Sequence, residues 1–173
     1  GGALLLAAPG TFGKTTLAGA FLRAGHRLLA DDVTCCQASA RPTVLPGPAL
    51  LRVRHDVFER LTFPDTRRAT ETAGKVHLAL EGPQRGSGSA IPLRGIVLLR
   101  RSQGEPAVER ADPSEALRDL FALSFNRLVD RASCFERVGD LVRQVPAWYL
   151  DRRLDYADLP RTVERIVAAC LAR

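Results

Sequence analysis

The chain has 173 residues, of which 46% are hydrophobic and 25% are charged, and its net charge is +6. This length and composition predict one soluble globular domain with a sizeable core, and they exclude a disordered tail, a collagen-like repeat and a small disulfide-rich scaffold. No apolar run reaches the roughly 18 residues that a membrane span needs, and scattered arginines without interleaved aromatic residues argue against a nucleic-acid partner.

The cysteines and the first residues of the chain indicate the cellular compartment in which we expect the protein. The four cysteines form no C-x-x-C pair, which argues against a zinc knuckle and predicts small buried thiols in a reducing cytoplasm. The opening GGALLLAA has no basic residue before its apolar run and leads directly into a Gly/Lys/Thr loop. We therefore interpret it as a buried strand rather than a secretory signal, and we expect a cytoplasmic protein.

The first 32 residues predict a compact βαβ unit. The expected elements are a strand buried on both faces over 2–8, a helix over 15–24 that ends at Gly25, and a second strand over 26–30. Because a short helix connects them, the two strands should be parallel, with a right-handed crossover.

The rest of the chain continues the alternation of strands and helices. Residues 40–90 are irregular, with a short helix and one alternating strand. The later elements are expected as a strand over 91–100, a helix capped by Asp112, a helix over 128–144, a strand over 145–150 and a helix over 159–173. This order predicts a single α/β domain.

Residues 8–16, Ala-Pro-Gly-Thr-Phe-Gly-Lys-Thr-Thr, fit the phosphate-binding loop pattern, except that Ala8 stands where glycine is commonest. Backbone N–H groups of such a loop can surround phosphate oxygens, and the following helix adds the positive end of its dipole. Lys14 would reach the β- and γ-phosphates, and the Thr15 hydroxyl would take a magnesium position. The candidate nucleotide-binding residues are Pro9, Gly10, Thr11, Phe12, Gly13, Lys14, Thr15 and Thr16. The alternative is an ordinary strand–helix turn that contains Gly-Lys-Thr-Thr.

Asp31 and Asp32 follow the second apolar run. In an open parallel sheet, ligands bind beyond the carboxyl ends of the strands, so we expect these aspartates to face the loop. One carboxylate can then point at a metal ion while the other faces the phosphate acceptor. The alternative is a helix N-cap or a turn pair. Lys75 is interpreted as a solvated strand end rather than as a phosphate ligand.

The stretch GTFGKTTLAGAFLRAGHRLLADDV resembles the HPr kinase/phosphorylase family, in which a Walker-type loop leads through a helix to Gly-His, an apolar strand and a paired Asp. The segments IPLRGIVLL and ADPSEALRDL resemble HPr-kinase-like proteins found beside peptide-modifying enzymes, including lasso-peptide serine kinases. The resemblance implies the P-loop core of phosphoenolpyruvate carboxykinases and HPr kinases, with a mixed sheet and flanking helices, in one kinase domain over 1–173.

That resemblance also implies an activity. An ATP-dependent kinase would transfer the γ-phosphate to a serine or threonine hydroxyl of a peptide or protein, and a ribosomal peptide precursor is one candidate acceptor. Asp31 would be the base that orients the hydroxyl, Lys14 would act with it, and Asp32 and Thr15 would hold Mg²⁺. We expect ATP and Mg²⁺ as cofactors and neither nucleic acid nor a membrane as partner. Whether the protein forms a homo-oligomer stays open, because the HPr enzymes that it resembles form rings.

Two departures from the family pattern keep other functions open. Pro92 stands where the family has the Glu of its Glu-x-Arg-Gly signature, and no histidine precedes the first strand. We therefore expect either a core that lacks N-terminal residues or a branch that relies on Asp31 alone. The alternatives are a nucleotide-binding regulatory module without transfer activity and a kinase for a small metabolite such as free serine.

Overall fold

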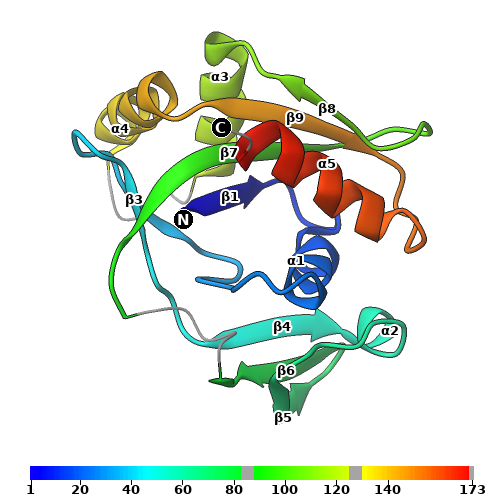
Figure 1. Ribbon diagram of the computed structural model, residues 1–173. Helices are drawn as coiled ribbons and strands as arrows, with labels where there is room; N and C mark the ends of the chain where they lie inside the picture. Colours follow the sequence, from blue (N-terminus) through cyan, green and yellow to red (C-terminus); the bar gives the residue numbers. More distant parts are fainter. Residues whose placement is uncertain (83–87, 125–129, 172–173) are drawn as a thin grey trace. The chain divides into compact units, whose positions relative to one another are not determined.

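The structure is a computed structural model that describes residues 1–82, 88–124 and 130–171 (Figure 1). Its elements, in chain order, are β1 (Ala3–Ala7), α1 (Lys14–Arg23), β2 (Cys35–Gln37), β3 (Thr43–Leu45), β4 (Leu50–Arg54), α2 (His55–Phe58), β5 (Thr66–Thr72), β6 (Lys75–Leu80), β7 (Ile91–Arg101), β8 (Ala107–Arg110), α3 (Pro113–Leu123), α4 (Arg131–Gln144), β9 (Ala147–Arg152) and α5 (Leu159–Leu171). The contacts divide the chain into two compact units. The first unit comprises Gly1–Lys14, Cys36–Val44 and Ile91–Arg173, and the second comprises Thr15–Cys35 and Leu45–Ala90.

The first unit is built on a six-stranded mixed sheet in which β7 is central. The strand order is β2-β3-β7-β9-β8, and β1 also pairs with β7. Both β1 and β9 run parallel to β7, whereas β3 pairs antiparallel with β7 and β8 pairs antiparallel with β9. The β7 residues Ile96 to Leu99 are buried, as expected for a strand with neighbours on both sides.

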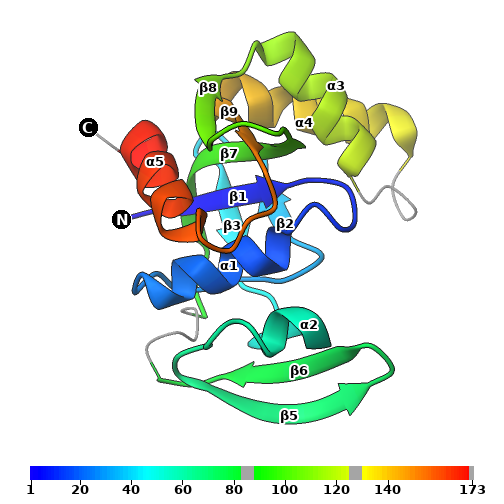
Figure 2. The ribbon, with the colours of Figure 1, turned by 90° about the vertical axis from the view of Figure 1, so that its right-hand side faces the viewer.

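Helices flank this sheet on both faces. Figure 2 shows α5 on one face and α3 and α4 on the other. The predicted start of α3 is confirmed, because the Asp112 side chain accepts from the N–H groups of Ser114 and Glu115, and Pro113 is the first helical residue. The predicted helices at α4 and α5 and the strand at β9 are also present. The chain is therefore an α/β protein with a mixed sheet and flanking helices.

The predicted βαβ unit at the start of the chain is wrong in its second strand. Residues 26–30 form no strand, and only Leu28 makes an isolated bridge. The parallel partner of β1 is instead β7, a longer apolar run from much later in the chain. The carbonyl of Leu29 accepts a hydrogen bond from the N–H of Gly47, so residues 26–30 are bonded to the loop between β3 and β4. The central leucines of β1 are half-buried rather than buried, contrary to the prediction of a strand buried on both faces.

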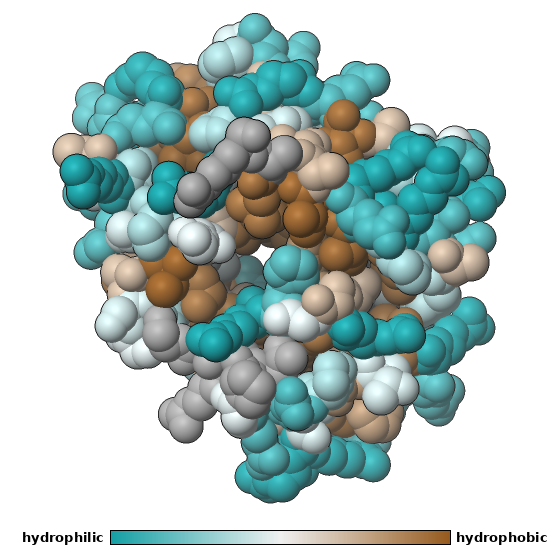
Figure 3. Space-filling view, viewed as in Figure 1, coloured by the Kyte–Doolittle hydropathy of each residue, from teal (hydrophilic) through white to brown (hydrophobic). Residues whose placement is uncertain are grey.

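The second unit contains a three-stranded antiparallel sheet with the order β4-β6-β5, together with α1 from Thr15 onward and α2. Alternate residues of β4 and β6 are buried, among them Leu51, Val53, Val76 and Leu78. The edge strand β5 is almost wholly exposed, and Figure 3 shows hydrophilic atoms at the lower end of the view, where Figure 1 places β5.

The four cysteines are free thiols, and none of them is buried, contrary to the prediction of small buried residues. Cys35 is exposed, and Cys36, Cys134 and Cys170 are half-buried. Over residues 1–82, 88–124 and 130–171, no helix has the length and apolar character required to cross a membrane.

Candidate phosphate-binding site

The predicted phosphate loop connects the carboxyl end of β1 to the first residue of α1, Lys14. Within it, the backbone φ angle is +65° at Thr11 and +77° at Gly13. Glycine adopts such angles freely, but a threonine does so at a cost, and strained backbone of this kind concentrates at ligand-binding positions. Two residues of the loop thus have left-handed backbone, and that the loop binds phosphate stays a prediction.

The Lys14 side chain folds back over the loop that precedes it. Its Nζ donates to the carbonyl oxygens of Ala8, at 2.7 Å, and Pro9, at 2.9 Å. These contacts hold an ammonium group beside the turn, directly before the helix whose first N–H groups have no partner within the helix. Positive charge therefore gathers at one point of the chain.

Arg101, the last residue of β7, contacts the middle of the loop, at Thr11 and Phe12. Its Nη2 donates to the Thr11 carbonyl at 2.7 Å. Its guanidinium carbon lies 4.9 Å from the centre of the Phe12 ring, within the range of a cation–π contact. This arginine therefore contacts two of the predicted nucleotide-binding residues.

Arg152, the last residue of β9, contacts the end of the loop, at Gly13. It is the register partner of Arg101, and its Nη2 donates to the Gly13 carbonyl at 3.2 Å. Only 2% of Arg152 is exposed. Burial lowers its pKa, and the charge of Asp158 opposes this effect. The carboxyl ends of three parallel strands thus supply the loop and two arginines that contact its carbonyls, which matches where ligands bind in open α/β sheets.

Asp31 and Asp32 lie in a bend of the second unit, not at the end of a strand, and Asp32 has a φ angle of +62°. Both contact Arg52 of β4. The Asp31 Oδ2 accepts from the Arg52 backbone N–H at 2.8 Å, and the Arg52 guanidinium lies 2.5 Å from Asp32 Oδ2. Burial raises the pKa of Asp31, an effect that the hydrogen bond from Arg52 opposes and the charge of Asp32 reinforces. Asp31 therefore binds a proton more readily than an exposed aspartate does.

The sequence-predicted residues fall into two groups. Pro9, Gly10, Thr11, Phe12, Gly13 and Lys14 form the loop of the first unit, whereas Thr15, Thr16, Asp31 and Asp32 belong to the second unit. That the aspartates face the loop stays a prediction.

Sequence reasoning missed Arg52 and Arg152. Arg152 lies two residues after the predicted last strand, and its position near a strand's carboxyl end is the signal that could have found it. Arg52 carries no comparable signal, because it lies in a segment that the sequence analysis left irregular.

In comparisons with known proteins, no family model and no curated protein matches the chain. Within the described ranges, no group of three or more His, Cys, Asp or Glu side chains is placed to hold a metal ion.

Proposed function

We propose that this protein is an ATP-dependent kinase of the HPr-kinase-like type that phosphorylates a serine or threonine hydroxyl of a peptide or protein. The observation that carries the proposal is the loop before α1, where Lys14 Nζ contacts the Ala8 and Pro9 carbonyls beside left-handed backbone at Thr11 and Gly13. A cation, a turn of this shape and a helix N-terminus together suit a triphosphate. Such a kinase would act in the cytoplasm.

In this proposal the loop binds the phosphates of ATP. Lys14 would exchange its two carbonyl contacts for oxygens of the β- and γ-phosphates. The helix that begins at Lys14 would place its positive end toward the same group. The Arg101 and Arg152 contacts would keep the loop in shape while the ligand binds.

Thr15 and Asp32 are the residues that would hold Mg²⁺. Their hydroxyl and carboxylate oxygens are donors that Mg²⁺ accepts, and the Asp32 carboxylate already attracts a cation, the guanidinium of Arg52. Bound there, Mg²⁺ would neutralise charge on the phosphate oxygens.

Asp31 would serve as the base. As the acceptor oxygen forms its bond to the γ-phosphorus and the bond to the β–γ bridging oxygen breaks, the hydroxyl proton would pass to the Asp31 carboxylate. The hydrogen bond from the Arg52 N–H orients this carboxylate. Its raised pKa suits a group that must take up a proton.

The test measures binding and transfer separately. Calorimetry with Mg·ATP and Mg·GTP measures binding, and incubation with γ-labelled ATP, a panel of serine-containing peptides and free serine measures transfer. Label in a peptide supports the proposal. Label in free serine replaces it with a metabolite kinase, and binding without transfer replaces it with a regulatory module. Failure of Mg·ATP to bind at millimolar concentration overturns it.

A further inference from the structure

Arg152 is a buried arginine whose hydrogen bonds are incomplete. Its relative solvent exposure is 2%. Over the described parts of the chain, its Nε has no hydrogen-bond partner. Buried polar groups are almost always paired, so an unpaired nitrogen on a buried cation requires an explanation.

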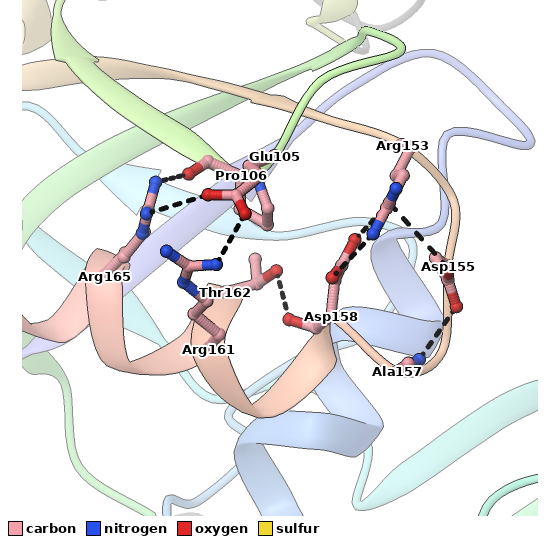
Figure 4. Close-up of polar contacts among 9 residues, drawn as sticks. All are labelled: Glu105, Pro106, Arg153, Asp155, Ala157, Asp158, Arg161, Thr162 and Arg165. Atoms are coloured by element: carbon pink, nitrogen blue, oxygen red, sulfur yellow. Dashed lines mark hydrogen bonds and ion pairs between the residues drawn. The ribbon is translucent and has the colours of Figure 1, made fainter.

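The charge of Arg152 also lacks a counterion of its own. No carboxylate of the described residues forms an ion pair with it within 4.0 Å. The acidic residue that influences it, Asp158, is bound to Arg153, with Nε–Oδ2 at 2.6 Å and Nη2–Oδ1 at 3.3 Å (Figure 4). A buried cation without a counterion destabilises the folded protein. The site therefore carries a positive charge that its own side chains do not neutralise.

The guanidinium lies directly against the phosphate loop. Its Nη2 donates to the Gly13 carbonyl at 3.2 Å, and a Cβ at Gly13 would lie 2.5 Å from the same nitrogen. Because a trans peptide unit is planar, a carbonyl of Gly13 that points at Arg152 directs the N–H of Lys14 to the opposite side. Arg152 thus contributes to the direction of the first N–H of α1, and a side chain larger than that of glycine at position 13 would require its guanidinium to shift.

We propose that Arg152 is a positioning residue for the loop and that the missing counterion of its guanidinium is the polyphosphate of the ligand. This inference rests on the proposed function and extends it, because it assigns a residue outside the loop to nucleotide binding. It implies that the unliganded protein retains Arg152 at the expense of its stability. Binding of a phosphate chain recovers that loss by placing negative charge across the loop.

The test compares Arg152→Met and Arg152→Lys with the wild type. Met matches much of the arginine volume without the charge, and Arg143→Met, which removes an exposed arginine bound to Asp140 on α4, is the control for net charge. Melting temperature without ligand and dissociation constants for Mg·ATP and for inorganic pyrophosphate are measured for each. We expect Arg152→Met to melt at or above the wild-type temperature and to bind both ligands about tenfold or more weakly. Arg152→Lys should fall between, and the control should match the wild type.

Each outcome decides between the two proposals. If the wild type binds Mg·ATP and Arg152→Met binds it within about twofold, the role of Arg152 is refuted and the proposed function stands. If Arg152→Met does not fold, the same comparison is made with Arg152→Lys, and unchanged affinity there refutes the role. If the wild type binds pyrophosphate but not Mg·ATP, the proposed function fails, and weakened pyrophosphate binding by the variants still supports Arg152. If it binds neither, both fail.

Discussion

The guanidinium of Arg52 lies 2.5 Å from the Asp32 carboxylate, while the backbone N–H of the same residue donates to Asp31. One residue of β4 therefore holds both acidic groups that the sequence singles out, but by different means. The main-chain contact would persist with any residue other than proline at this position, whereas the ion pair depends on the arginine side chain. Substitution of Arg52 can accordingly separate the two contacts.

Arg52→Ala should shift the pH dependence of phosphate transfer. The Arg52 charge contributes to lowering the pKa of Asp31, so its loss raises that pKa further above the ordinary value of 3.8. Since a base must be ionised to accept a proton, the acidic limb of the kcat profile should move to higher pH. The control is Arg54→Ala, which removes another arginine of β4, an exposed one that forms an ion pair with Asp56 of α2. If the acidic limb lies at the same pH in Arg52→Ala and in the wild type, the Arg52 charge does not influence the pKa of Asp31 as the catalytic base.

Asp31→Asn should abolish most transfer while nucleotide binding persists. Loss of a general base lowers a rate by about 10²–10⁴-fold, whereas this side chain does not belong to the loop that would bind ATP. Burial raises the pKa of Asp31, so the folded state holds its proton more tightly and loses stability as pH rises above 3.8. The variant should therefore melt no lower than the wild type at neutral pH. Wild-type transfer by a folded Asp31→Asn protein would rule out this base.

Gly13→Ala should disrupt the loop, and Gly10→Ala should not. Gly13 has a φ angle of +77°, and a Cβ there would meet Arg152 Nη2 at 2.5 Å, whereas a Cβ on Gly10 meets nothing within 4 Å. Left-handed backbone costs alanine about 1–2 kcal/mol, which corresponds to a melting-temperature decrease of about 2–8 °C for a chain of this size. Differential scanning calorimetry of the two variants measures the difference. Equal melting temperatures would show that Gly13 is not constrained.

Tyr149→Phe should reduce stability in a manner that depends on pH. Tyr149 donates to Asp119 at 2.9 Å, and burial, aided by this hydrogen bond, raises its pKa to about 12. Because the folded state keeps the proton while the unfolded chain loses it near pH 10.0, this stabilisation is complete below that pH and is lost as pH rises toward about 12. The melting-temperature gap between wild type and variant should narrow over the same range. A difference in melting temperature that stays constant between pH 10.0 and about 12 would contradict a raised pKa of Tyr149.

Local signals in the sequence predicted most individual elements. The apolar run before Pro9 is β1, the helical spacing that ends at Gly25 is α1, and Asp112 with Pro113 begins α3. Capping residues, turn residues and hydrophobic spacing act over a few positions, so they can be interpreted without knowledge of the rest of the chain. The loop before Lys14 was found in the same way.

Long-range pairing decided what those signals could not. The partner of β1 is β7 rather than residues 26–30, and Arg101 and Arg152 reach the loop because β7 and β9 end in register beside each other. An apolar run shows that a segment tends to be buried, but which other run it pairs with depends on the energy of the whole sheet. The sequence alone therefore located the loop, and the tertiary structure determined which charges lie against it.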